Sequence, residues 1–382
     1  MPTRRFVLSA GGASAVILAS GGCGRADLDR ARAPWSAAGR DFADPRLNAL
    51  SYAVLAPSPH NRQPWIIRLD GDDAATVFCD PERLLPQTDP PNRQIVIGFG
   101  AFLELLRQAA AERGDAVDVT PFPEGEPQPT LDARPIAAVR FRFGAAPPRD
   151  PLFGAALARR TARTPFAEDR PVTDAMLRGL ANDAFDGPSD AFAWTVDRAR
   201  AARLAAICKR AWRIEVATDR TLEESVRLTR IGAREIAGNP DGISLSGAPI
   251  DFAAATGLLT REKMLDPAST AYAQTLSVYE RAIDSAPAFG WIISKETTRR
   301  DELKAGAAWV RLHLAAQRAG LAFHPLSQAL QEFPEMSGPY TDLHDMLGVA
   351  APARIQGFFR FGFAKFPPPA PRWALETRLA SA

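Results

Sequence analysis

A long, alanine-rich helical pattern occurs twice in this chain of 382 residues. The two copies keep a constant offset of 206 positions, and the matching pairs are Arg93 with Arg299, Gly100 with Gly306, Ala101 with Ala307, Leu106 with Leu312, Ala109 and Ala110 with Ala315 and Ala316, and Gly114 with Gly320. Small residues at matched positions allow two helices to approach closely. The repeat predicts an internal duplication, in which two related α+β halves pack as a pseudo-dimer. The alternative is a chance similarity between alanine-rich segments.

The length and composition agree with two globular halves. A chain of 382 residues exceeds one ordinary hydrophobic core, and 46% hydrophobic with 24% charged residues is typical of a globular protein. We place the first half at 44–148 and the second at 149–382, with Pro147 and Pro148 at the junction. The net charge is only +2 and no Lys/Arg-rich tract occurs, so no nucleic-acid partner is expected.

The N-terminus has the features of an export signal. Residues 3–8 read TRRFVL, a twin-arginine start, and the apolar run over 6–19 is too short and weak for a mature transmembrane helix. Cys23 follows small residues, so residues 1–23 are interpreted as a twin-arginine signal that is also a possible lipoprotein signal. We expect a periplasmic protein, or one anchored to the membrane through lipidated Cys23, with a linker at 24–43. A disordered N-terminal tail is the alternative.

Cysteine and histidine spacing gives no sign of a metal centre. Cys79 and Cys208 occur in apolar patterns and are expected to be buried thiols rather than a disulfide. The chain has four histidines, and none has metal-ligand spacing. They are His60, His313, His324 and His344.

Hydrophobic periodicity and the positions of proline and glycine predict the helices and strands around two polar segments. Asp44 and Pro45 begin a helix that must end before Pro57. A loop over 57–64 then leads into strands near 65–69 and 76–79 and a helix over 93–113. We expect a strand at 137–143, and further helices from 150 into the segment at 159, over 173–183, over 199–237 and over 268–285. The glycine-containing stretch 238–266 is interpreted as a loop-like lid, or equally as a surface excursion.

The two polar segments are candidates for ligand binding. Residues 159–163 read RRTAR, and three guanidiniums with a hydroxyl suit a phosphate, although a solvated basic surface is the alternative. In the loop over 57–64, three prolines stiffen the backbone that carries Ser58, Asn61 and Gln63. Fixed donors and acceptors suit the edge of a polar heterocycle, and a plain structural turn is the alternative.

Together, the two segments resemble the flavin-binding motifs of the nitroreductase superfamily. The PSPHNRQPW stretch from Pro57 is similar to that superfamily's flavin loop, and RRTAR to its phosphate segment. Their order, within a duplicated chain behind a twin-arginine signal, resembles the Acg-type FMN-binding branch. The resemblance implies an α+β nitroreductase-like fold, internally duplicated so that one chain mimics the usual homodimer.

The resemblance also implies an FMN site between the halves. Its phosphate and ribityl chain would be held by Arg159, Arg160, Thr161 and Arg163, and the ring by Ser58, Pro59 and Asn61, with Gln63 near the edge. A turn whose backbone N–H faces flavin N5 would be formed by Pro325, Leu326, Ser327 and Gln328. Arg372 would close the phosphate site. The chain departs from the pattern at Ser327-Gln328, where ordinary relatives have Glu-Gly, and at Trp373, where relatives often have a second arginine.

Each motif occurs once, so one chain is expected to bind one FMN. The implied reaction is hydride transfer from NAD(P)H to FMN and on to a nitroaromatic or quinone acceptor, with no catalytic side chain named. We interpret His60 as a loop residue that bonds backbone. One alternative is a flavin-binding or flavin-storing protein with little turnover, since NAD(P)H is scarce outside the cytoplasm. Another is a solute-binding lipoprotein without flavin. A pseudo-dimeric monomer is expected, and further association is left open.

Overall fold

The computed structural model describes residues 24–185, 187 and 189–380, in which two antiparallel sheets share one strand order. The first runs β1-β2-β4-β3 and the second β5-β8-β10-β9, so each half places its strands in the order first, second, fourth, third. Strands of the first sheet are β1 (Trp65–Asp70), β2 (Ala74–Cys79), β3 (Ala116–Pro121) and β4 (Ala137–Arg142). Those of the second are β5 (Phe192–Thr195), β8 (Ala288–Ser294), β9 (Ala322–Pro325) and β10 (Arg354–Gly362). The α+β fold and the internal duplication are therefore confirmed.

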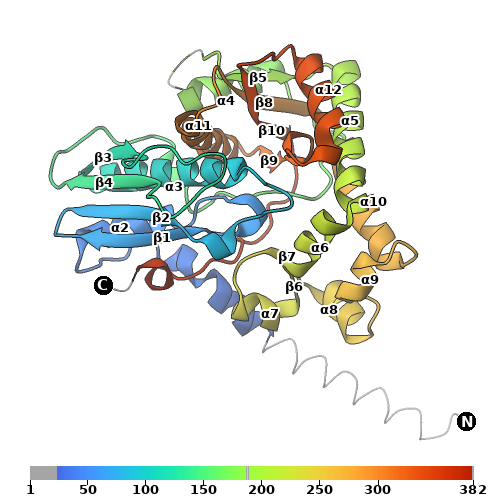
Figure 1. Ribbon diagram of the computed structural model, residues 1–382, viewed down its shortest axis with the longest axis horizontal. Coiled ribbons are helices and arrows are strands. Elements are labelled where there is room, and N and C mark those ends of the chain that lie inside the picture. Colours follow the sequence, from blue (N-terminus) through green and yellow to red (C-terminus); the bar gives the residue numbers. More distant parts are fainter. Residues whose placement is uncertain (1–23, 186, 188, 381–382) are drawn as a thin grey trace, which may run out of the picture.

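The repeated helices pack against each other at the centre of the molecule. They are α3 (Arg93–Glu112) and α11 (Arg299–Arg318), and each follows the second strand of its sheet (Figure 1). A Cβ built on Gly100 would lie 2.0 Å from the Leu303 carbonyl oxygen, and one on Gly306 would lie 1.9 Å from that of Ile97. Only glycine permits this crossing, because any side chain would collide with backbone that cannot move away.

The arginines that begin the two helices each reach into the opposite half. Arg93 donates to Glu332 at 2.9 Å, and Arg299 donates to the carbonyl oxygens of Pro91 and Pro129 at 2.7 and 2.8 Å. Both guanidiniums are buried and fully engaged, so the reciprocal contacts tie the halves together. By length and hydropathy α3 could cross a membrane, but 89% of its apolar window is buried in the protein. We therefore assign α3 to the core.

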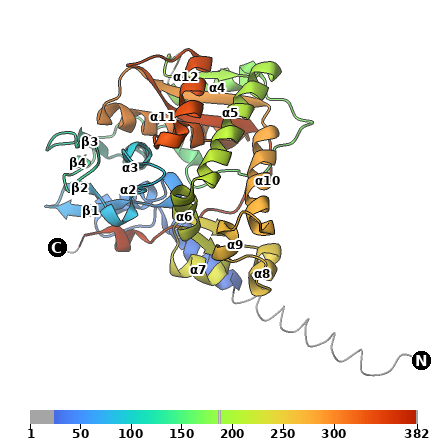
Figure 2. The same ribbon diagram turned by 45° about the vertical axis from the view of Figure 1, so that its right-hand side comes forward.

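The remaining helices cover the sheets and form a smaller layer beside them (Figures 1 and 2). In the first half, α2 covers α3, beginning after Asp44, whose carboxylate accepts from the Arg46 N–H at 2.9 Å. Besides α3, α11 and a helix over residues 24–37, the described chain contains α2 (Pro45–Ala53), α4 (Asp174–Phe185), α5 (Arg198–Ala217), α6 (Asp219–Arg227), α7 (Gly232–Gly238), α8 (Ala248–Ala255), α9 (Arg261–Leu265), α10 (Thr270–Asp284) and α12 (Ser337–Leu347). Both described cysteines, Cys79 and Cys208, are buried free thiols, as expected.

Two helix predictions were wrong. The single helix expected over 199–237 is broken into α5, α6, β6 (Thr229–Ile231) and α7, because Thr218 is extended and Gly232 has a φ of 80°. The helix expected from 150 into 159 is one 3₁₀ turn at Phe153–Ala155. The chain is then extended at Thr161, which pairs in parallel with Phe323 at the edge of the second sheet. Hydrogen bonds to that sheet edge replace those of the expected helix.

The stretch 238–266 is not a loop. It contains β7 (Ile243–Leu245), paired in parallel with β6, followed by α8 and α9. Asp241 anchors its start, because the buried carboxylate accepts from Arg62 at 3.2 Å, Arg83 at 2.8 Å and Arg230 at 2.7 Å. Two of these arginines belong to the first half. The stretch is therefore held to both parts of the protein, and its role as a lid stays a prediction.

Both ends of the described chain also pack onto the body. Residues 24–37, part of the expected linker, are helical, which follows from their alanine and arginine content. Trp35 of this helix is buried and donates to the Ala370 carbonyl oxygen at 2.8 Å. At the other end, Leu379 pairs with Ile67 of β1, so the C-terminal segment returns to the first sheet. The predicted signal at residues 1–23, including Cys23, lies outside the described residues.

Candidate functional site

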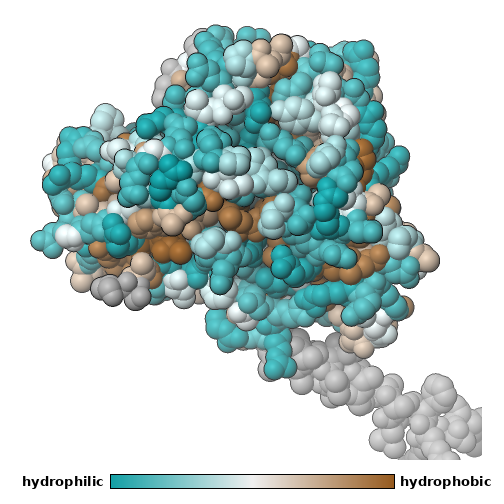
Figure 3. All heavy atoms as spheres, viewed as in Figure 1, coloured by the Kyte–Doolittle hydropathy of each residue, from teal (hydrophilic) through white to brown (hydrophobic). Residues whose placement is uncertain are grey.

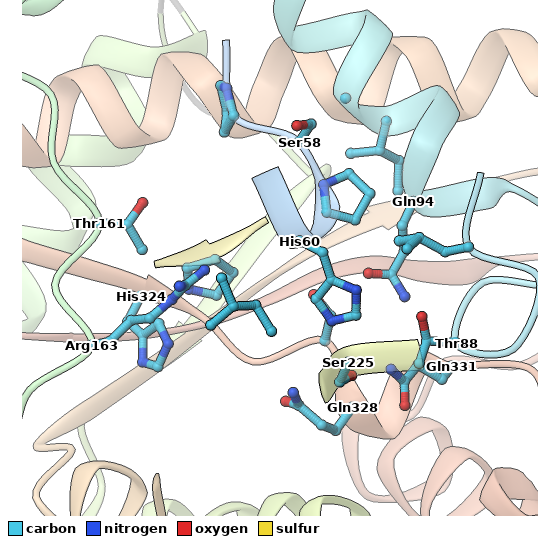
Figure 4. A pocket seen from close by; sticks show the side chains of 18 of the residues that line it. Ser58, His60, Thr88, Gln94, Thr161, Arg163, Ser225, His324, Gln328 and Gln331 are labelled. Carbon is cyan, nitrogen blue, oxygen red and sulfur yellow. The ribbon is translucent and has the colours of Figure 1, made fainter. Parts of the chain in front are cut away.

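A cavity of about 280 Å³ lies between the loop over 57–64 and the second half of the chain. Its walls come from both halves, since Pro57 and Gly98 belong to the first and Tyr279 and Trp309 to the second. Figure 4 shows Thr161 and Arg163 on one side and Thr88, Ser225 and Gln331 on the other. Seven of the residues predicted from the sequence line it, namely Ser58, Pro59, Thr161, Arg163, Pro325, Ser327 and Gln328. The space-filling view shows apolar side chains gathered in a band across the middle of one face (Figure 3).

The loop that forms one wall has an unusual backbone. His60, Asn61 and Gln63 have φ values of 45°, 52° and 50°, a left-handed conformation that side chains disfavour. Each such residue costs of order 1 kcal/mol and persists where surrounding contacts impose it. One such contact is the Ser58 hydroxyl, which accepts from the Gln63 N–H at 2.9 Å. The loop is thus held in one shape, as a fixed binding wall requires.

Asn61 and Gln63 do not line the cavity. Asn61 donates to the Pro371 carbonyl oxygen at 3.0 Å and accepts from Arg372 at 2.6 Å. Gln63 is fully buried; it donates to the Pro240 carbonyl oxygen at 2.8 Å and accepts from the Trp373 N–H at 2.9 Å. Their side chains hold the C-terminal segment and the stretch after α7 against the loop. The structure therefore gives these two predicted flavin contacts a supporting position behind the wall.

Three predicted phosphate ligands surround one aromatic ring. The guanidiniums of Arg159, Arg160 and Arg372 lie 5.6, 5.0 and 5.3 Å from the centre of the Trp35 ring. Arg159 and Arg372 both donate to the Leu55 carbonyl oxygen, two residues before the loop begins. We call Arg159, Arg160 and Arg372 the arginine cluster. Through Leu55 and Ala56 it meets the start of the loop, but its members do not line the cavity, and Arg372 lines a second one of about 340 Å³.

The arginine cluster carries uncompensated positive charge. In the part of the chain that the structure describes, no carboxylate forms an ion pair with Arg159, Arg160 or Arg372. Burial and the neighbouring Arg160 lower the pKa of Arg159 to about 9, and burial with Arg159 and Arg160 lowers the pKa of Arg372. No described residue hydrogen-bonds the Nε atoms of Arg159 and Arg372. A dianionic phosphate supplies the acceptors and the charge that this cluster lacks.

Within the described chain, five buried polar atoms around the cavity also lack a partner. They are His60 Nδ1, Glu215 Oε2, Ser225 Oγ, Trp309 Nε1 and Gln331 Oε1, and their residues all line the cavity. Unpaired buried polar groups cost about 1–3 kcal/mol each, so such atoms are normally satisfied. Because their residues line one space, a ligand there with several donors and acceptors would lie close to these atoms. A flavin ring with its ribityl chain has that character, so these residues fit the implied cofactor.

Burial makes the histidines of the cavity neutral near pH 7. Burial, with Arg163 and Arg62 nearby, lowers the pKa of His60 to about 4. Burial and Arg360 lower the pKa of His324, whose Nδ1 accepts from Arg360 Nε at 2.8 Å. His60 was expected to bond backbone, and this was wrong for Nδ1, which faces no partner because the left-handed backbone turns the ring into the cavity.

The turn predicted to face flavin N5 is only partly at the cavity. Pro325, Ser327 and Gln328 line it, and Leu326 does not. Leu326 is buried in the core of the second half, and its N–H donates to the Phe358 carbonyl oxygen at 2.8 Å. Among the cavity residues that the motifs missed are Thr88, Gln94, Glu215, Ser225, Tyr279, Trp309 and Gln331. They come from scattered elements with no shared local pattern, so only the tertiary structure identifies them.

Comparison with known proteins gives a partial match. The chain is 34% identical over 140 residues to a Mycobacterium tuberculosis protein named "Putative NAD(P)H nitroreductase acg", covering 34% of this chain and 39% of that relative. An uncharacterized protein of the same organism is 35% identical over 150 residues, with coverages of 36% and 40%. The chain thus matches about two fifths of the length of these curated relatives. No family model matches the chain.

Solved structures agree only weakly with the whole molecule. A nitroreductase-like protein from Bacillus cereus has a TM-score of 0.35 and 17% identity, covering 62% of this chain and 98% of its own. The FMN-dependent nitroreductase NfnB from Mycobacterium smegmatis, solved with NADPH, has a TM-score of 0.36 and 19% identity, with coverages of 59% and 95%. The sequence matches confirm the resemblance indicated by the motifs: over about a third of its length, the chain is a homologue of a protein named as an NAD(P)H nitroreductase.

Proposed function

We propose that this protein binds one FMN between its halves and acts as an NAD(P)H-dependent oxidoreductase on nitroaromatic or quinone acceptors. The observation that carries the proposal is the pairing of two incomplete sites. In the described part of the chain, residues that line the cavity carry five buried polar atoms without a partner, and no carboxylate pairs with the arginine cluster that meets the start of the loop. FMN joins a hydrogen-bonding ring system to a phosphate, so one molecule complements both. The homologue named as an NAD(P)H nitroreductase supports the same reaction class.

The residues divide into those that would hold the phosphate and those that would hold the ring. Thr161 and Arg163 line the cavity two and four residues after Arg159, so the segment runs from the arginine cluster into the cavity. Ser58 and Pro59 form part of the opposite wall. When bound, FMN would supply hydride and electron transfer, while these residues position it and exclude water.

Purified protein tests the proposal directly. Wild type is expected to be yellow, or to become yellow with added FMN, with one FMN per chain. Arg159→Ala combined with Arg163→Ala should give colourless protein, because two of the guanidiniums near the proposed phosphate position are lost. Arg178→Ala is the matched control, since Arg178 lies on the exposed face of α4 and pairs with Asp174. Full FMN occupancy in the double variant would contradict the phosphate assignment.

A flavin-storing protein and a solute-binding lipoprotein are separated by two further observations. NADPH added without oxygen should bleach the flavin colour of an oxidoreductase, and a storage protein would stay yellow. Wild type that never binds FMN would favour the solute-binding protein. Export by the twin-arginine route, attachment through Cys23 and a monomeric state stay predictions from the sequence.

A further inference from the structure

We propose that Glu215 is the proton donor to the molecule reduced in the cavity, which makes the preferred acceptor one whose reduced atom takes up a proton, such as a nitro or quinone oxygen. This inference rests on the proposed function. Glu215 lies on α5 and is only 3% exposed, yet it lines the cavity. Its Oε2 atom has no hydrogen-bond partner among the residues that the structure describes. A buried carboxyl with one free oxygen at a ligand cavity is suitably placed to transfer a proton.

Two glutamines of the turn after β9 hold the carboxyl in place. The Tyr279 hydroxyl donates to Gln328 Oε1 at 3.1 Å, so the amide nitrogen of Gln328 is left as the donor. The side chains of Gln328 and Gln331 both hydrogen-bond Glu215. Oε2 has no hydrogen-bond partner among the described residues, so neither glutamine occupies it. Gln328 stands in the turn predicted to face flavin N5, so the carboxyl adjoins the proposed reaction centre.

Glu215 is the one acid among the described residues that line the cavity. Burial raises its pKa to about 7, the two glutamines oppose that rise, and Glu224 of α6 adds to it. The other titratable groups nearby are unsuited to donate a proton near neutral pH. Burial lowers the pKa of His60 and His324, and raises that of the Tyr279 phenol on α10.

An acceptor that gains two electrons and one proton as a hydride from the reduced flavin carries a negative oxygen. The O–H bond of Glu215 breaks, a new O–H bond forms on that oxygen, and the carboxylate regains a proton from water. Arg163 lines the cavity and is exposed, so solvent is within reach for this last transfer.

The test compares holoprotein of wild type, Glu215→Gln, Glu215→Asp and the control Glu223→Gln, which makes the same charge change at an exposed position of α6. The first readout is the visible absorbance of bound oxidised FMN between about pH 5 and about pH 9. Wild type, Glu215→Asp and Glu223→Gln should show a spectral transition, near pH 7 in wild type, that Glu215→Gln lacks. The second is reoxidation of dithionite-reduced protein by 1,4-benzoquinone. In Glu215→Gln it should be slower by about a hundredfold near pH 6 and independent of pH.

Each result separates this inference from the proposed function. Glu215→Gln that binds FMN and keeps both the spectral transition and the rate of wild type would overturn the role of Glu215 and leave the oxidoreductase proposal standing. Wild type that binds no FMN after reconstitution would overturn both. If Glu215→Gln does not fold, Glu215→Asp decides: a shifted transition and a reduced rate support the role, and wild-type behaviour in both overturns it.

Discussion

Gly100 of α3 and Gly306 of α11 meet where the two repeated helices cross, and the Cβ that either lacks would lie about 2 Å from backbone carbonyl oxygen of the other helix. The two residues are equivalent in the repeat. Their contact therefore lies where the two halves pack against each other. The cavity and the arginine cluster depend on this packing, because both contain residues from the two halves.

Gly100→Ala or Gly306→Ala should destabilise the protein severely, because the helices must separate by more than an ångström and the surrounding core loses its packing. We expect a loss of about 3 kcal/mol or more in the free energy of unfolding, measured by urea denaturation. Gly179→Ala is the control, since this α4 glycine has nothing within 4 Å of a built Cβ. It should stabilise by about 0.5–1 kcal/mol. Equal effects at Gly100 and Gly179 would contradict the close crossing.

Asp241→Ala should release the stretch that begins after α7. The substitution leaves Arg62, Arg83 and Arg230 without the carboxylate that they share, and Asp241 is only 4% exposed. Removing one partner of a buried ion pair costs about 3–5 kcal/mol. Limited proteolysis should cut residues 238–266 faster than in wild type. The exposed Asp266→Ala is the comparison, and similar cleavage of the two variants would argue against the anchor.

Trp35→Ala should weaken FMN binding without removing any proposed ligand. The indole ring packs against all three guanidiniums of the arginine cluster, and each cation–π contact contributes about 0.5–2 kcal/mol. Without the ring we expect a rise of about tenfold or more in the FMN dissociation constant, measured by fluorescence titration. Trp35→Phe keeps an aromatic face and should bind more tightly than Trp35→Ala. Unchanged affinity in Trp35→Ala would show that the helix over 24–37 does not organise the cluster.

Stability should fall as the pH drops below 6.5, partly because of His60. Its pKa is about 4 in the folded protein against an ordinary 6.5, so between these values the unfolded chain binds a proton that the folded protein does not. The stability that His60 contributes is fully present above pH 6.5 and is lost as the pH falls from 6.5 to about 4. Near pH 5 it amounts to about 2 kcal/mol at most. Urea midpoints near pH 7.5 and near pH 5 should differ less in His60→Asn than in wild type, and an equal difference would exclude His60.

Local patterns were enough for much of the first half. The Asp44-Pro45 start, the strands at 65–70 and 74–79 and the helix over 93–112 lie within a few residues of where periodicity placed them. The matched glycines also predicted the central helix pair correctly. Most of these features arise from contacts between neighbours in the sequence. The matched glycines are informative because small residues allow two helices to pack closely.

Tertiary contacts decided the rest. The segment at Thr161 is extended because the edge of the second sheet offers hydrogen bonds, which no local preference reveals. Asn61 and Gln63 support the loop from behind because the C-terminal segment returns to it from 310 positions away. Glu215 faces the cavity because α5 packs beside the turn that carries Gln328. The sequence alone identified the two motifs and the duplication; which side chains meet depends on packing between distant segments, because their energies come from long-range burial and pairing rather than from local conformation.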